Sequence, residues 1–144
     1  MAKGNKQKDT KVSKNKAKVS KPIVKKQYVD LFYMIPECVG AKEIADILVQ
    51  VNPAYEEKLE CWEEAGVLEI LLGEESSIDM EMLELSEDEL ADEFLQEHQI
   101  KEVYLVHADS QRLDDVKKAV TILKDKFGGL LCSDTKDFMP IILQ

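Results

Sequence analysis

The apolar positions between residues 100 and 133 change their spacing twice, which predicts a strand, a helix and a second strand. Within residues 100–107, Val103, Leu105 and Val106 form a short apolar run typical of a mostly buried strand. Over residues 110–127 the apolar side chains recur every three or four positions, as on a helix with one buried face. Gly128 and Gly129 predict the end of this helix, and residues 130–133 begin another apolar strand. Because a helical crossover usually joins parallel neighbours, we expect the two strands to pair within a right-handed βαβ unit.

The same patterns predict further elements on the N-terminal side of this unit and after it. Pro140 cannot donate a hydrogen bond to a sheet, so a terminal strand that contains it is expected at an edge or a bulge. The resulting order is βααββαβαβ, which indicates an α/β or α+β fold with a mixed sheet and about four helices. The predicted elements are a central or near-central strand at 28–35, helices at 41–51 and 53–65, a hairpin at 67–72 and 78–85, a helix at 86–99 opened by a Ser86–Glu89 capping box, and a last strand at 137–143.

Charge divides the 144 residues into two parts. Residues 1–27 carry a net charge of +9 and no aromatic residue before position 28, so they bury too little apolar surface to fold. We expect a disordered tail at 1–27 and a single acidic domain at 28–144, whose net charge is −19. The tail lysines are Lys3, Lys6, Lys8, Lys11, Lys14, Lys16, Lys18, Lys21, Lys25 and Lys26, against one acidic residue, Asp9.

Composition also narrows the class of protein. Three widely spaced cysteines without a CxxC pair indicate neither a disulfide framework nor a zinc ribbon, which favours the reducing cytoplasm. The chain has no apolar run long enough to cross a membrane and no apolar segment of a secretory signal after the lysines. Nucleotide-binding, calcium-binding and zinc-protease motifs are also missing, so no cofactor and no metal are expected.

One candidate site follows from the expected parallel pairing. Ligands of open α/β sheets bind beyond the carboxyl ends of the strands, and two such ends would lie together here. For ligand binding the candidates are Asp109, Ser110, Ser133 and Asp134, and for nucleophilic catalysis only His107 and Cys132 could form a pair. A structural interpretation competes with both: Asp109 and Ser110 cap a helix, His107 finishes a strand, and Cys132 is an inert core residue.

No motif ties this chain to one reaction, and the sequence favours a protein without catalytic activity. The acidic body favours an interaction module, such as an adaptor or an immunity-type inhibitor, that binds a basic partner. One alternative is a ligand-binding or hydrolytic protein that uses the strand ends at 100–107 and 130–133. The other is a nucleic-acid-associated protein whose basic tail contacts phosphates without sequence specificity. The tail could also fold back on the acidic body or only increase solubility.

Overall fold

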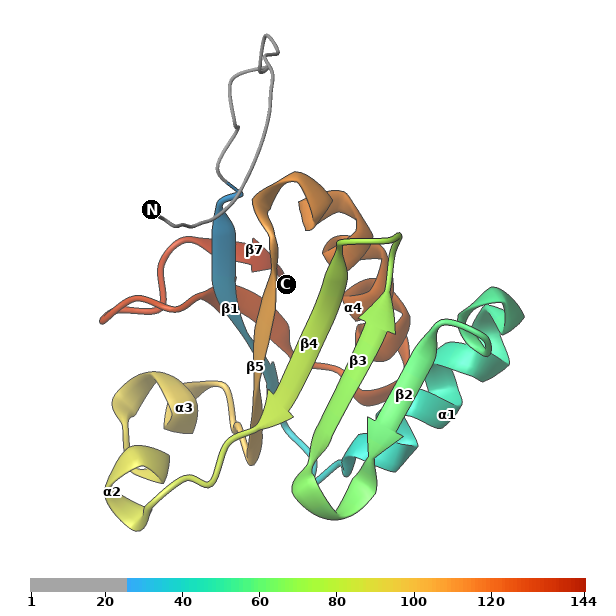
Figure 1. Cartoon of the computed structure of the whole chain (residues 1–144). Coiled ribbons are helices and arrows are strands. Elements are labelled where there is room, and N and C mark those ends of the chain that lie inside the picture. Colours follow the sequence, from blue (N-terminus) through green and yellow to red (C-terminus); the bar gives the residue numbers. More distant parts are fainter. Residues whose placement is uncertain (1–25) are drawn as a thin grey trace, which may run out of the picture.

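The computed structural model describes residues 26–144 of the chain. The predicted disordered tail therefore lies outside the described residues, apart from its last two positions. In the described part, one seven-stranded sheet has the long helices α1 and α4 on one face (Figure 1). The short helices α2 and α3 lie at one end of the other face, which confirms the predicted class of sheet and helices in layers.

All six strand pairings in the described residues are antiparallel, so the sheet is antiparallel where a mixed sheet was predicted, and its spatial order is β2-β3-β4-β5-β1-β6-β7. The strands are β1 (Tyr28–Ile35), β2 (Leu59–Trp62), β3 (Val67–Leu71), β4 (Ser77–Met82), β5 (Glu102–Asp109), β6 (Leu130–Ser133) and β7 (Ile141–Leu143). The helices are α1 (Ala41–Val51), α2 (Glu87–Leu90), α3 (Glu93–Glu97) and α4 (Leu113–Phe127), with single 3-10 turns at Pro53–Tyr55, Glu63–Ala65 and Ser110–Arg112.

The prediction that residues 100–107 and 130–133 pair directly was wrong, because β1 lies between these strands. β1 pairs antiparallel with β5 on one side and with β6 on the other. β5 and β6 therefore run in the same direction without touching, and α4 crosses over β1 to connect them, as in a split βαβ unit. β1 can occupy this central place because both its faces are apolar at its carboxyl end, where Tyr33, Met34 and Ile35 are all buried.

Gly129 allows β6 to lie against β1. Its φ is +96°, a conformation that side-chain-bearing residues rarely adopt. A Cβ atom at this position would stand 2.0 Å from the carbonyl oxygen of Met34. Gly129, one of the two glycines that predicted the end of α4, thus also sets how closely the chain after α4 approaches β1.

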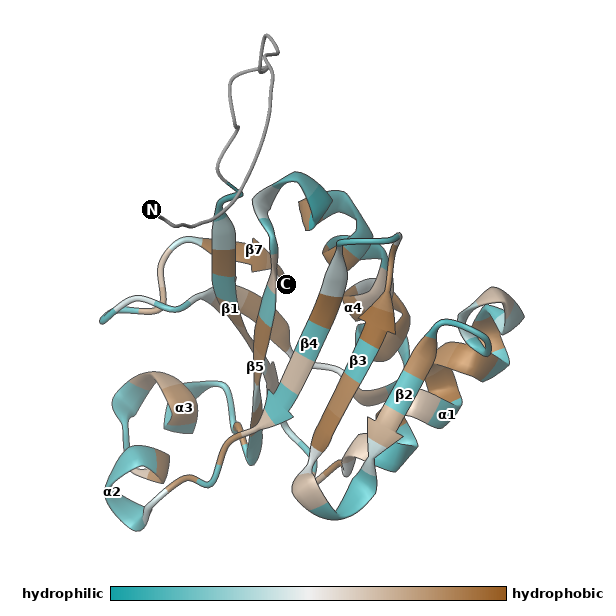
Figure 2. Ribbon diagram, viewed as in Figure 1, coloured by the Kyte–Doolittle hydropathy of each residue, from teal (hydrophilic) through white to brown (hydrophobic). Residues whose placement is uncertain are grey.

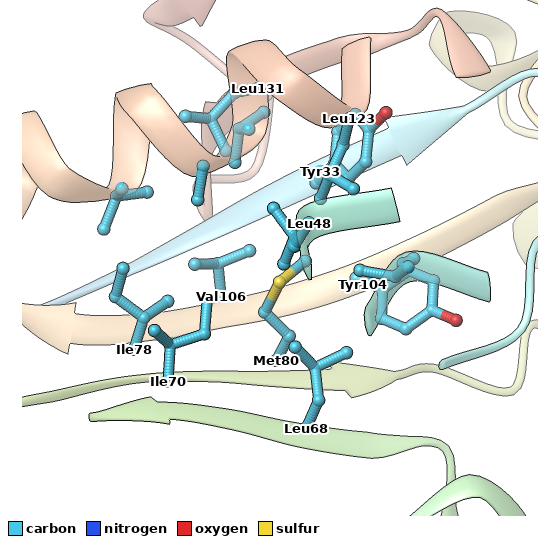
Figure 3. Close-up of a cluster of buried hydrophobic side chains, with 14 of the residues drawn as sticks. Tyr33, Leu48, Leu68, Ile70, Ile78, Met80, Tyr104, Val106, Leu123 and Leu131 are labelled. Carbon is cyan, nitrogen blue, oxygen red and sulfur yellow. The ribbon is translucent and has the colours of Figure 1, made fainter. Parts of the chain in front are cut away.

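The main core lies between the sheet and the two long helices. Leu48 of α1 points at the sheet next to Met80, and Leu123 of α4 lies near Tyr33 (Figure 3). All four side chains are at most 1% exposed. The buried tyrosines keep their hydroxyl groups paired: Tyr33 donates to the Gly128 carbonyl at 2.8 Å, and Tyr104 donates to the Val39 carbonyl at 2.6 Å.

A second, smaller apolar cluster lies on the opposite face of the sheet, under α2 and α3. Met34 of β1, Val103 of β5 and Cys132 of β6 contribute the sheet side, and Leu95 of α3 covers them. Phe138, from the loop between β6 and β7, packs against the edge of the same cluster. The second face is therefore covered at only one end of the strands.

The helix predicted at 53–65 was wrong. Asn52 caps only a 3-10 turn, and residues 59–62 form the edge strand β2 instead. In this strand Leu59 and Cys61 turn toward the main core, while Glu60 and Trp62 face outward, which is the two-residue period of a strand. Gly66, with φ +69°, closes the tight connection to β3.

The remaining differences concern lengths. The hairpin at 67–72 and 78–85 is confirmed as β3 and β4, and the Ser86–Glu89 capping box is present at the start of α2. The helix predicted at 86–99 is divided in two because the Asp92 side chain accepts a hydrogen bond from Phe94 N and caps α3. The last strand is shorter than predicted, but it pairs with β6 at the sheet edge with a register shift, as Pro140 indicated.

Candidate functional site

The predicted site residues lie at one end of the sheet but on two strands that do not touch. His107 and Asp109 end β5, while Cys132 and Ser133 end β6, and β1 separates the pairs. Asp109 is 7% exposed, and its carboxylate accepts a hydrogen bond from Gln111 N at 2.9 Å, so it caps the 3-10 turn that begins at Ser110. The geometry favours a capping role for Asp109.

The Ser133 and Asp134 backbones also have partners. Ser133 N donates to the Pro140 carbonyl at 3.1 Å, and Asp134 N donates to the Asp30 carbonyl at 3.3 Å. These contacts hold the loop after β6 against β1 and β7. They leave the Ser133 and Asp134 side chains as candidates whose ligand-binding role stays a prediction.

Cys132 and His107 have different environments. Cys132 is fully buried in the second apolar cluster, and burial together with the negative charge of Asp134 raises the pKa of its thiol to about 12. His107 is half-exposed, and no hydrogen bond among the described residues joins it to Cys132. A thiol that stays protonated is a weak nucleophile, so this geometry gives no support to the catalytic pair.

We expect the three thiols of the native protein to differ sharply in their reaction with an aromatic disulfide reagent at pH 8. Cys38 is exposed and should react first, Cys61 is half-buried with a raised pKa and should be slower, and Cys132 should react only after unfolding. The variant Cys38→Ser should lose the fast phase alone. Rapid reaction of Cys132 in the folded protein would show that its thiol is accessible, and Cys132 would again be a candidate nucleophile.

A row of ionisable side chains crosses the second face of the sheet at mid-height. Successive strand registers align Glu60 of β2 with Glu69 of β3, Glu69 with Asp79 of β4, Asp79 with His107 of β5, and His107 with Asp30 of β1. These five residues are called the acidic row below. Neighbouring strands are about 4.8 Å apart, so the row spans roughly 19 Å. Every member is exposed or half-exposed.

The acidic row places like charges directly against each other. Burial, followed by the negative charges of Asp79 and Glu60, raises the pKa of Glu69. Ser77 Oγ donates to an Asp79 carboxylate oxygen at 3.2 Å, which supports that carboxylate without neutralising it. Like charges on directly opposite positions of paired strands destabilise a sheet. The fold therefore bears an electrostatic cost at this place.

His107 is held at the β1 end of the row. Its Nδ1 atom lies 2.7 Å from Oδ1 of Asp30, and its ring stacks on Tyr28 with centroids 4.9 Å apart. The imidazole thus has a fixed orientation between two carboxylates, those of Asp30 and Asp79. It is the one sequence-derived candidate that the structure places in the acidic row.

The surface around the row is mixed in character. Along β4, hydrophilic and hydrophobic residues alternate (Figure 2), as expected of a strand with one buried and one exposed face. Two residues along β2 from Glu60 of the row, Trp62 lies opposite Val67 and is 48% exposed. No strand in the described part of the chain contains lysine or arginine, so no permanently charged cation of the sheet itself balances the row.

An apolar pocket of about 140 Å³ opens between this face and the helices α2 and α3. Phe32 and Val103 form its sheet wall, and Leu95 and Phe138 close two other sides. The positions that line it continue the alternation of the acidic row, because Phe32 follows Asp30 by two residues on β1. The pocket and the row therefore belong to one continuous surface.

Between positions 26 and 144, no three His, Cys, Asp or Glu side chains stand close enough to hold a metal ion together. None of the described helices is long and apolar enough to cross a membrane.

Comparison with known proteins identifies no relative. No protein-family model, no curated protein and no solved structure matches this chain. The function is therefore argued from the geometry of the second face of the sheet.

Sequence reasoning missed most of the acidic row and all of the pocket. The available signal was the alternation of Ile78, Asp79 and Met80, which shows that Asp79 points away from the main core. That alternation assigns a face to each carboxylate. It does not show which residues of neighbouring strands lie opposite each other, and only the structure gives this register.

Proposed function

We propose that this protein is a non-catalytic interaction module that binds a basic protein segment on the second face of its sheet. The acidic row carries the proposal. Carboxylates kept opposite each other lower the stability of the sheet, and a positively charged ligand lying across them would relieve that cost. Local rules of stability are most often broken where function requires it.

The wider charge distribution supports the same class of partner. Residues 28–144 carry a net charge of −19, which repels nucleic-acid phosphates and attracts lysine and arginine side chains. Association with a basic segment should then be fast and sensitive to salt. The exposed Trp62 beside the row offers the kind of aromatic contact that often dominates a protein interface.

The test compares two charge-matched double variants of the full chain in titrations with an octalysine peptide. Glu69→Gln with Asp79→Asn removes two charges from the acidic row. The control, Asp114→Asn with Asp125→Asn, removes two exposed charges from α4 on the opposite side of the sheet. At low salt, the row variant should bind about 10-fold more weakly than the unchanged chain, and the control should differ by less than about 2-fold.

Folding is checked on the same samples. Because the pKa of Glu69 is raised in the folded state, the ionised carboxylate lowers the free energy of unfolding. This loss of stability is present above the raised pKa and disappears as the pH falls and the carboxyl takes up a proton. Replacing Glu69 with glutamine should therefore leave the free energy of unfolding at pH 7 unchanged or slightly increased. Equal losses of binding in the row variant and the control would show a general charge effect and would overturn the proposal, as would binding that salt does not weaken.

The alternatives retain less support. Hydrolysis by Cys132 and His107 is disfavoured because the Cys132 thiol is buried and its pKa is raised. Binding of a small ligand at the strand ends stays a prediction. The lysines that would contact nucleic acid lie outside the described residues, except Lys26, whose ammonium group contacts the carbonyl oxygen of Glu75.

A further inference from the structure

The pocket between the sheet and α3 has the size and lining of a site for one apolar side chain. Its volume of about 140 Å³ is close to that of engineered protein cavities that accept benzene, roughly 150 Å³. Phe32 and Phe138 both face it, with ring centroids 6.0 Å apart and planes inclined by 58°. A third aromatic ring could meet them edge to face, an arrangement that aromatic pairs prefer.

Phe138 reaches the pocket from an unusual backbone conformation. Its φ is +61°, which is a costly value for a bulky residue. The loop holds it there through Phe138 N, which donates to the Thr135 carbonyl at 3.1 Å, and through Thr135 Oγ1, which donates to the Met139 carbonyl at 2.8 Å. The chain thus maintains a strained residue as a wall of the pocket.

Two carboxylates border this apolar space. Glu89 and Asp92 line the pocket, and both are exposed to solvent. One oxygen of each is fixed by a backbone N–H group: Ser86 N at 3.0 Å for Glu89 and Phe94 N at 2.9 Å for Asp92. The border is therefore negative and fixed in position, which favours an apolar side chain carried by a positively charged segment.

The distance from the pocket to the acidic row limits the spacing of such a segment. Along β1, Phe32 in the pocket lies two residues from Asp30 in the row, and along β5, Val103 lies four residues from His107. Strands rise about 3.4 Å per residue, so pocket and row are roughly 7 to 14 Å apart. An extended peptide covers this distance in two to four residues.

We propose that the pocket receives one phenylalanine-sized side chain of the basic partner, two to four residues away from the lysine or arginine side chains that contact the acidic row. This inference rests on the proposed function and makes the partner more specific. The apolar side chain provides affinity by burial, and the cations set the position on the sheet.

The experiment uses the full chain and synthetic peptides in which two glycines separate one phenylalanine from four lysines, prepared in both sequence orders. Each is compared with the same peptide carrying alanine in place of phenylalanine. In at least one order, the phenylalanine peptide should bind roughly 10-fold or more tightly, as expected for burying one large apolar side chain. Equal binding of the phenylalanine and alanine peptides in both orders would overturn the inference.

A variant that fills the pocket serves as the matched test on the protein side. Leu85, half-buried between β4 and α2, lines the pocket, so Leu85→Trp should abolish the preference for phenylalanine while the binding of octalysine persists. Leu71→Trp, at an exposed position outside the pocket, should keep the preference. A preference that survives Leu85→Trp would exclude the pocket.

These outcomes separate the inference from the proposed function. If lysine peptides bind through the acidic row and phenylalanine adds nothing, only the pocket assignment fails. If phenylalanine strengthens binding but the Glu69→Gln, Asp79→Asn variant binds octalysine like the unchanged chain, only the role of the row fails.

Discussion

Replacing Gly129 with alanine is expected to lower the free energy of unfolding by about 3 kcal/mol or more, among the largest effects that one methyl group can have. The added Cβ atom would lie 2.0 Å from the carbonyl oxygen of Met34 and 3.0 Å from its carbonyl carbon, and the φ of +96° is itself unfavourable for alanine. Relief requires β6 to move away from β1, which disturbs the ladder of hydrogen bonds between these two strands. Urea unfolding followed by far-ultraviolet circular dichroism measures the change.

Gly73→Ala is the matched control. A Cβ atom at Gly73 would meet only the end of the Arg112 side chain, at 3.5 Å, which is an ordinary contact with a flexible group. Its cost should stay within about 0.5 kcal/mol, as for most surface substitutions. If both alanine variants lost stability equally, the close approach of Gly129 to β1 would not be the cause.

Leu48→Ala should destabilise the protein by about 2 to 5 kcal/mol, because it leaves a cavity between α1 and the sheet. Leu48 is fully buried in the main core, where it points at the sheet next to Met80 (Figure 3). α1 also packs against β2 and β3, so this contact attaches the outer strands to the rest of the domain. Urea unfolding at pH 7 reports the loss as a lower midpoint.

The control for this substitution comes from the same helix. Val51 is 59% exposed at the end of α1, and Val51→Ala should change the free energy of unfolding by no more than about 0.5 kcal/mol. A cost below about 1 kcal/mol for Leu48→Ala would mean that the core collapses around the missing atoms, and that α1 contributes less to stability than its burial indicates.

Elements with an unambiguous period could be predicted from sequence. The helix at 41–51 and the long helix α4 show apolar residues at three- and four-residue intervals, and β4, the second strand of the hairpin, shows strict alternation. Each of these patterns is formed by residues close together in the sequence, so the element can be recognised without knowing its tertiary contacts. The class of fold followed from them.

The segment from 53 to 65 shows where local information is insufficient. Tyr55, Leu59 and Trp62 are spaced four and three residues apart and fit a helix, whereas Leu59 and Cys61 are two residues apart and fit a strand. Pairing with β3 decides between them, and that pairing depends on the rest of the sheet. Tertiary contacts therefore override a helical pattern here.

Strand order and the site depend on distant pairings in the same way. The insertion of β1 between β5 and β6 has no local signature, and it separates Cys132 from His107 although both were correctly placed at strand ends. The same pairings create the acidic row, because Asp30, His107 and Asp79 come from three distant segments. Sequence identified the charge of this protein but not the surface on which that charge is arranged.

The central position of β1 also affects how the protein is made. β1 is synthesised well before its partners β5 and β6, which lie far downstream in the chain. Such distant pairings slow folding, and meanwhile the apolar strand YVDLFYMI is without its neighbours and prone to aggregate. Charged residues that flank apolar strands reduce this hazard, and Lys25 and Lys26 stand just before β1. Lys25 and Lys26 are therefore placed where their charge would limit aggregation of β1 before its neighbouring strands are made.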